Sequence, residues 1–66
     1  MQHRIRELRT SHGWTQEQLS EKLSVSRQTI ISIENGRYSP SLELAYKIAK
    51  LFQMTIEEVF IFEERE

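Results

Sequence analysis

Residues 15–36, TQEQLSEKLSVSRQTIISIENG, constrain the fold more than any other part of the chain. Thr15 and Ser26 are hydroxyl residues of the type that caps helix N-termini, and apolar residues at helical spacing follow each of them. Gln18 stands three residues after Thr15, which completes the pattern of a capping box. The segment therefore predicts two short helices joined by a tight turn.

The second of these helices has a polar outer face. Ile30 and Ile33 are spaced to face the core. The side chains left pointing away from the core are Arg27, Gln28, Thr29, Ile31 and Ser32. Arg and Gln both form bidentate hydrogen bonds with base edges, and an α-helix fits the major groove of DNA. This outer face is therefore a candidate for reading DNA.

The rest of the chain predicts three more helices. The first runs from about Gln2 to Ser11 and ends at Gly13, since glycine takes the left-handed cap conformation at least cost. A helix with a wide apolar face from Leu42 to Phe52 follows, and a last short helix ends at about Phe60. Residues 61–66 alternate weakly, so this tail can form a short strand.

Composition excludes several kinds of site. At 66 residues the chain is expected to form one small domain, residues 1–66, that buries only about 60% of its unfolded surface. It contains neither Cys nor Asp, which excludes disulfides, thiolate zinc sites, a Ser-His-Asp triad and Asp-based calcium or magnesium loops. His3 and His12 lack a partner motif and are read as surface residues near the ends of the first helix. We expect no enzyme activity, no metal and no cofactor.

The net charge of −1 is divided unevenly along the chain. Residues 1–50 carry eight Lys or Arg and five Glu, whereas residues 51–66 carry one Arg and five Glu. Because the acid is concentrated in the tail, it need not face phosphates, and near-neutral charge does not exclude nucleic acid. No segment approaches the roughly 18 apolar residues of a membrane span, and the start lacks the apolar run of a signal peptide. We expect a cytoplasmic protein.

A larger set of residues at fixed spacing resembles the XRE or Cro/phage-repressor family of helix-turn-helix regulators. The match runs from about residue 5 to residue 60, and it is closest to the short family members that act as dimers. The residues that carry it are Gln16, Leu19, Val25-Ser26, Ile30, Ile33-Glu34-Asn35-Gly36 and Pro40-Ser41-Leu42. The resemblance implies an all-α, compact five-helix lambda-repressor-like domain, with the helix-turn-helix at 15–35 and a dimerisation tail at about 56–66.

The resemblance also implies roles for individual residues. Gln16 matches a position whose side chain and backbone N–H clamp a phosphate at the positive end of a helix. Glu34 matches a structural acid that pairs with an arginine of the first helix, here Arg9. The residues assigned to DNA binding, from the outer helix face and from the resemblance together, are Gln16, Ser26, Arg27, Gln28, Ile31, Ser32, Asn35, Arg37 and Tyr38.

Some residues keep two interpretations. Ile31 suits contact with a thymine methyl or a half-buried helix edge, and Tyr38 suits a phosphate contact or loop packing. Trp14 is read as a core residue rather than as a platform on which bases stack. Arg4 and Arg6 are read as solvated charges. Which of the recognition-helix side chains contact bases and which contact phosphates stays open.

Two positions depart from the family pattern. Ser20 stands where a small Ala is usual at the helix crossing, and its hydroxyl can bond back to a carbonyl of its own helix. Ser24 stands at a turn position that is often Gly. If that position needs positive φ, serine costs about 1 kcal/mol of backbone strain.

Five apolar residues exceed what so small a core can plainly bury: Leu44, Leu51, Phe60, Ile61 and Phe62. The tail can cover the fourth helix with them, but surplus apolar area in a marginal monomer favours a two-fold dimer interface. We therefore predict a DNA-binding transcriptional regulator, a repressor, which acts as a homodimer on an inverted repeat with half-sites roughly 34 Å apart. Two alternatives stay open: an antitoxin whose acidic tail engages a basic toxin, and a protein-interaction module that does not bind DNA.

Overall fold

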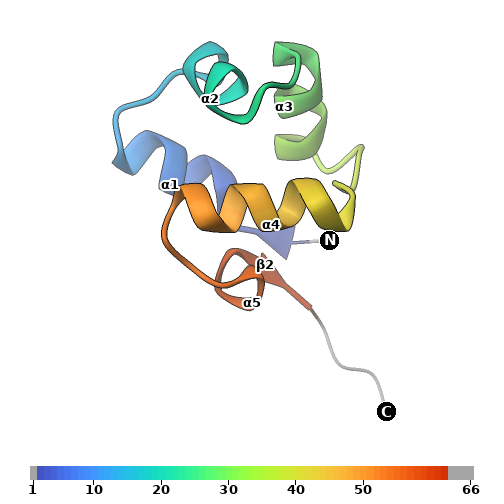
Figure 1. The fold of residues 1–66 in the computed structure, drawn as a ribbon. Coiled ribbons are helices and arrows are strands. Elements are labelled where there is room, and N and C mark those ends of the chain that lie inside the picture. The colour runs from blue at the N-terminus through green and yellow to red at the C-terminus, as the bar shows by residue number, and fades with distance from the viewer. Residues whose placement is uncertain (1, 63–66) are drawn as a thin grey trace.

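The computed structural model describes residues 2–62 of the chain. Within this range it has five helices and two short strands (Figure 1). In chain order these are β1 (Gln2–His3), α1 (Ile5–Ser11), α2 (Gln16–Leu23), α3 (Arg27–Glu34), α4 (Leu42–Leu51), α5 (Ile56–Val59) and β2 (Phe60–Ile61). The predicted fold class, a five-helix domain with a strand in its tail, is confirmed.

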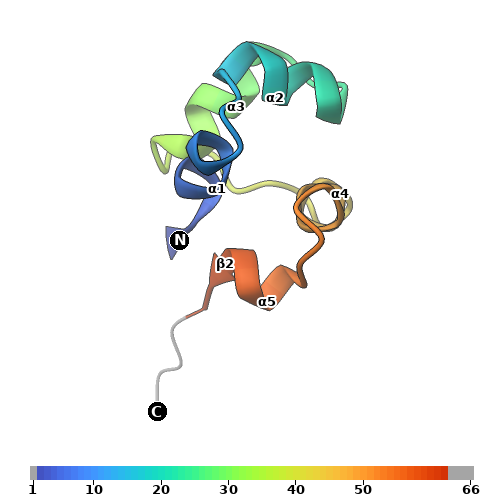
Figure 2. The same ribbon diagram turned by 90° about the vertical axis from the view of Figure 1, so that its left-hand side faces the viewer.

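The helices are arranged in tiers along the molecule. Helices α2 and α3 lie side by side at one end, and α1 and α4 lie below them (Figures 1 and 2). Helix α5 and strand β2 lie at the opposite end, beneath α4. The helix-turn-helix is therefore separated from the C-terminal elements by the middle tier. None of the helices within residues 2–62 has the length and apolar character that crossing a bilayer requires.

Hydroxyl caps begin α2 and α3, as the sequence predicts, and they also begin α4 and α5. The Thr15 hydroxyl accepts from the Gln18 backbone N–H at 3.0 Å, and the Gln18 side chain accepts from the Thr15 N–H at 2.8 Å. The Ser26 hydroxyl accepts from the Thr29 N–H at 3.1 Å and so begins α3. Ser41 caps α4 in the same way. Thr55 caps α5 and, with Glu58, forms a second capping box.

A residue in the left-handed conformation follows each of the helices α1 to α4. Gly13 and Gly36 have φ values of +74° and +76°, as glycine at such ends should. Ser24 takes φ +59° after α2, so the anticipated strain at this position is present. Gln53 takes φ +57° after α4, which the sequence analysis does not foresee because glutamine carries no left-handed preference.

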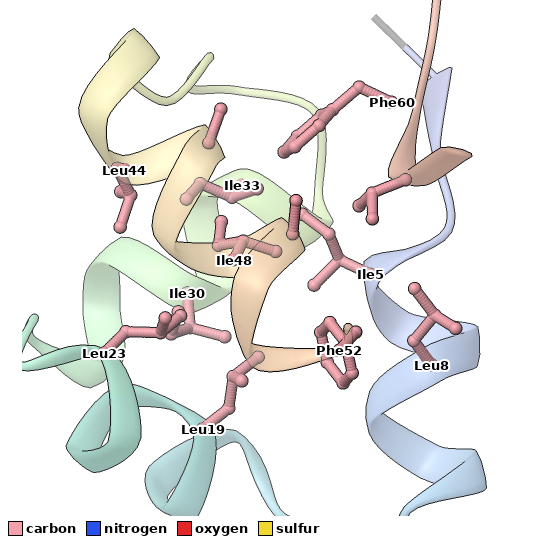
Figure 3. Close-up of a cluster of buried hydrophobic side chains, with 13 residues drawn as sticks. Ile5, Leu8, Leu19, Leu23, Ile30, Ile33, Leu44, Ile48, Phe52 and Phe60 are labelled. Carbon is pink, nitrogen blue, oxygen red and sulfur yellow. The ribbon is translucent and has the colours of Figure 1, made fainter. Parts of the chain in front are cut away.

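The core lies between α1, α4 and the helix-turn-helix and extends down to the tail (Figure 3). It consists of Ile5, Leu8, Leu19, Leu23, Ile30, Ile33, Leu44, Ala45, Ile48, Ala49, Phe52, Val59 and Phe60. Trp14 packs against this cluster. Its ring stacks on Phe52 at 5.6 Å between centroids, and Lys22 Nζ lies 4.6 Å from the centroid of the Trp14 ring. The interpretation of Trp14 as a core residue is thus confirmed.

Strand β1 corrects the predicted start of the first helix. Gln2 and His3 pair antiparallel with Ile61 and Phe60 of β2, and α1 begins only at Ile5. Local periodicity cannot reveal this pairing because the partner strand lies at the far end of the chain. His3 is likewise not a plain surface residue: its Nε2 donates to the Ile33 carbonyl at 2.8 Å, and its ring contacts the Phe60 ring edge-on.

Two of the five residues that were predicted to form surplus apolar surface are buried, so the prediction is wrong for them. Leu44 is only 8% exposed and Phe60 only 1%, since both complete the chain's own core. Leu51 is half-buried, whereas Ile61 and Phe62 are 43% and 57% exposed. Leu42, which the periodicity places on the inner face, is instead 78% exposed. The interface residues that remain available are therefore Ile61 and Phe62, with Leu51 in part.

Candidate nucleic-acid interface

The first turn of α3 presents two long polar side chains to solvent. Arg27 and Gln28 directly follow the cap residue Ser26, and all three are exposed. The Ser26 hydroxyl also lies 2.9 Å from the Thr29 hydroxyl. Because the cap fixes where α3 begins, it also fixes the direction in which these side chains leave the helix.

The remaining predicted residues lie further along α3 or beyond it. Ile31 and Ser32 are half-buried, so Ile31 occupies a helix edge as one of its two interpretations requires. Asn35, Arg37 and Tyr38 are exposed in the loop that follows α3. Eight helical residues at about 1.5 Å each place this loop about 12 Å from the first turn. The structure thus spreads these residues along α3, from its first turn to the loop after it.

A buried carboxylate at the end of α3 joins the first three helices. The Glu34 side chain is 0% exposed, and its Oε2 accepts from Arg9 Nε at 2.7 Å. Its Oε1 accepts from Arg9 Nη2 and Gln16 Nε2, each at 3.2 Å, and from Arg6 Nε at 3.4 Å. Arg9 Nη1 in turn donates to the Trp14 carbonyl at 2.9 Å. The predicted pairing of Glu34 with Arg9 is confirmed.

The ionisation of Glu34 follows from these contacts. Burial alone raises the pKa of its carboxyl group. The hydrogen bonds from Arg9 and Gln16 and the charge of Arg9 outweigh burial, so the pKa lies below its ordinary value. Glu34 is therefore an anion at neutral pH, and its negative charge holds the two arginines of α1 against the end of α3.

Gln16 lies at the junction between this cluster and the surface. Its side-chain nitrogen is bonded to Glu34, which ties the predicted phosphate clamp to the end of α3. Gln16 is also the first residue of α2, where backbone N–H groups have no partner within the helix. An anion placed there would meet oriented N–H donors and the positive end of the helix dipole.

A cleft of about 570 Å³ runs between α1 and the starts of α2 and α3. It is lined by Arg6, Arg9, Thr15, Gln16, Glu17 and Arg27. Two predicted site residues, Gln16 and Arg27, therefore share one cleft with α1. Sequence reasoning assigned no role here to Arg6. The signal that could have found it is its spacing from Arg9, because residues three apart lie on one helix face.

Comparisons with known proteins identify the family of the chain. A family model described as helix-turn-helix matches residues 5–59. The chain is 54% identical over 66 residues to an HTH-type transcriptional regulator of Methanocaldococcus jannaschii and covers 100% of both proteins. It is 53% identical to another such regulator, from Archaeoglobus fulgidus, of which it covers 94% while all of its own length is matched.

A solved structure has the same arrangement of helices. The hypothetical transcription factor NHTF from Neisseria superposes with a TM-score of 0.77, and the match covers 86% of this chain and 66% of that one. At 22% sequence identity, this likeness concerns the fold alone.

Proposed function

Since the chain belongs to the helix-turn-helix family of transcriptional regulators, we propose that it binds a specific inverted-repeat operator as a homodimer and represses transcription. The observation that carries this proposal is the exposed, capped first turn of α3 with Arg27 and Gln28. In the major groove, Arg27 suits O6 and N7 of guanine, and Gln28 suits N6 and N7 of adenine. Each such pair is worth about 1–3 kcal/mol of discrimination.

Phosphate contacts would set the orientation of α3 in the groove. Gln16 would bind one stretch of backbone before α3, and Asn35, Arg37 and Tyr38 would bind another beyond it. Gln16 lines one cleft with Arg27 of the first turn of α3, whereas Asn35, Arg37 and Tyr38 lie in the loop after α3. This placement supports the division, because a helix in the groove has backbone on both sides. Ser26, Ile31 and Ser32 would complete the surface that faces the bases.

The homodimer would place two copies of α3 in successive major grooves, roughly 34 Å apart. Strand β2 lies at the end of the molecule opposite α2 and α3 (Figure 1). Its residue Ile61 and the next residue, Phe62, are exposed, and their apolar area supports a contact between copies there. Among the described residues 2–62 no third strand pairs with β1 or β2, so their outer edges also offer backbone groups of the kind through which strands of two chains pair.

The relatives include both an activator and a repressor of transcription. The HTH-type transcriptional activator BcrR of Enterococcus faecalis is 43% identical over 61 residues, and the chain covers 30% of that protein. The competence pilus inhibition repressor of Acinetobacter baylyi is 39% identical over 62 residues, and the chain covers 54% of it. We propose repression because a dimer bound within a promoter excludes polymerase by its volume alone. Transcription from the chain's own promoter in vitro should then fall as the protein is added.

Selection of bound sites from random DNA tests the proposal. The expected result is an inverted repeat with half-site centres about 10 base pairs apart. Arg27→Ala and Gln28→Ala should each weaken binding and relax the preference at one base pair, while folding is retained. Lys50→Ala removes an exposed charge from α4 and should leave every base preference unchanged.

Failure to enrich any sequence would refute sequence-specific reading. If the protein binds no DNA even at low salt, it is a protein-interaction module instead. The antitoxin alternative depends in part on Glu63, Glu64 and Glu66, which lie outside the described residues.

A further inference from the structure

We propose that Arg6 is a phosphate-binding residue that holds the DNA backbone in the cleft between α1 and the starts of α2 and α3. This inference rests on the proposed DNA binding and adds the first helix to the surface that contacts DNA. Nothing in the family match or in the relatives' names assigns a role to this position.

The hydrogen bonding of Arg6 leaves part of its guanidinium available. Its Nε donates to Glu34 Oε1 at 3.4 Å, and its side chain is 61% exposed. Within residues 2–62, neither of its terminal nitrogens has a hydrogen-bond partner. A guanidinium group is a planar fork with five N–H donors, so one edge can remain on a carboxylate while another binds a phosphate oxygen.

Arg9 differs from Arg6 in its hydrogen bonding and exposure. All three of its guanidinium nitrogens are occupied, two by Glu34 and one by the Trp14 carbonyl. Its side chain is only 12% exposed. Arg9 therefore has a structural role, and Arg6 is the arginine of this pair whose charge reaches the open cleft.

The charges around the cleft favour an anion. Glu34 carries one negative charge against the two positive charges of Arg6 and Arg9, so this cluster has one positive charge in excess. Arg27 adds another from α3, and Glu17 on α2 is the exposed acid that offsets it. A phosphodiester, with a single negative charge and two free oxygens, matches the excess.

The position of the cleft identifies the backbone of DNA as the source of that phosphate. Arg27 lines the cleft from the first turn of α3, the part of the helix that is proposed to enter the groove. Gln16, the proposed clamp, lines it from α2. Backbone that contacts Gln16 must therefore pass in front of Arg6, and Glu34 holds the Arg6 guanidinium in place before DNA arrives.

Salt dependence of binding tests the proposal. With the selected operator, Arg6→Gln should make the fall of log affinity with log salt less steep, by about 0.9 for each bound protomer, because one phosphate contact is lost. The loss of affinity should be equal on specific and non-specific DNA. Arg4→Gln is the matched control: Arg4 precedes α1 and pairs with Glu7 at 3.2 Å but does not line the cleft. The salt dependence of binding by Arg4→Gln should equal that of the wild type.

Uncharged methylphosphonates, placed one at a time along the operator, would locate the phosphate. At one position per half-site the substitution should weaken wild-type binding several-fold and have no further effect on Arg6→Gln. Arg6→Met serves as a second neutral variant if Arg6→Gln does not fold, as judged by circular dichroism.

The outcomes separate this inference from the proposed function. If the wild-type protein binds its operator and the neutral Arg6 variants keep the wild-type slope, the Arg6 inference is wrong and the proposed function stands. If the wild-type protein binds no DNA at low salt, the proposed function fails first. A reduced slope in Arg4→Gln equal to that in Arg6→Gln would show a general charge effect and would also overturn the inference.

Discussion

Glu34 is the residue that determines how the first three helices meet. It ends α3, and its carboxylate accepts hydrogen bonds from Arg6 and Arg9 of α1 and from Gln16 of α2. Burying a charge is unfavourable unless it is paired, and removal of one partner from a buried pair costs about 3–5 kcal/mol. The arrangement therefore stabilises the fold only while Glu34 is ionised.

Acid should remove the stabilisation that ionised Glu34 provides. The pKa of Glu34 is lower in the folded protein than its ordinary value of 4.5, so the folded state binds fewer protons than the unfolded state as pH falls through this range. The stabilisation is present above about pH 4.5 and is lost as pH drops through the lower, folded-state pKa. Glu34→Gln should reduce the free energy of unfolding at pH 7 by about 3 kcal/mol.

Urea unfolding of wild type and Glu34→Gln between pH 3 and pH 7 checks this prediction. The difference between the two proteins should shrink toward acid pH, because only the wild type loses the ionised carboxylate. Glu43→Gln, at an exposed position of α4, is the control and should follow the wild-type pH dependence. A difference that stays constant over the whole range would contradict the assigned ionisation.

Among the elements, helix ends are what local sequence predicts best. A cap residue and the N–H it satisfies are only two or three positions apart, so the pattern in the sequence is already the contact. Thr15 and Ser26 cap as predicted, and Ser41 and Thr55 cap α4 and α5 through the same short-range contact. Strand β1 is the opposite case, since its two residues become a strand only because β2 lies beside them.

The turn inside the helix-turn-helix carries strain that a substitution can remove. Ser24 has φ +59°, a conformation that costs an ordinary residue roughly 1–2 kcal/mol and glycine little. Because glycine also loses more entropy on folding, Ser24→Gly should raise the free energy of unfolding by only about 0.5–1 kcal/mol. Thermal unfolding followed by circular dichroism measures the change.

Gly13→Ala provides the reverse experiment. Gly13 has φ +74°, and no atom lies within 4 Å of the position that a Cβ would take, so the effect of adding a methyl group is conformational rather than steric. The substitution should lower the free energy of unfolding by about 1 kcal/mol. If Ser24→Gly also lowers the free energy of unfolding, the turn is not strained by the positive φ of Ser24.

At the scale of the whole molecule, the apolar side chains divide between the core and an exposed surface that is proposed to meet a second copy. Leu44 belongs to the core, whereas Ile61 of β2 and the next residue, Phe62, are exposed. Strand β2 lies at the end of the molecule opposite α2 and α3 (Figure 2). This division corrects the interface predicted from sequence, which groups all three residues. It also separates the residues that fold the monomer from those proposed to join two copies.

Substitutions in the core and substitutions at the exposed residues Ile61 and Phe62 should have different effects. The double variant Ile61→Ser/Phe62→Ser should shift the mass in sedimentation equilibrium from dimer toward monomer and leave the helical content unchanged. Leu44→Ala should instead reduce the free energy of unfolding by about 2–5 kcal/mol, because it leaves a cavity in the core. A wild-type mass of a monomer at tens of micromolar would refute the proposed dimer.

What the sequence by itself determined is local. The helix caps, the glycine ends and the inward faces of α2 and α3 depend on residues a few positions apart. The resemblance to a known family, and not a local pattern, implied the Glu34–Arg9 pair, whose members lie 25 positions apart. Tertiary structure alone decided the pairing of β1 with β2, the burial of Leu44 and Phe60, and the cleft that sets Arg6 beside Gln16 and Arg27. These contacts join segments distant in the chain, and their geometry arises only when the helices pack.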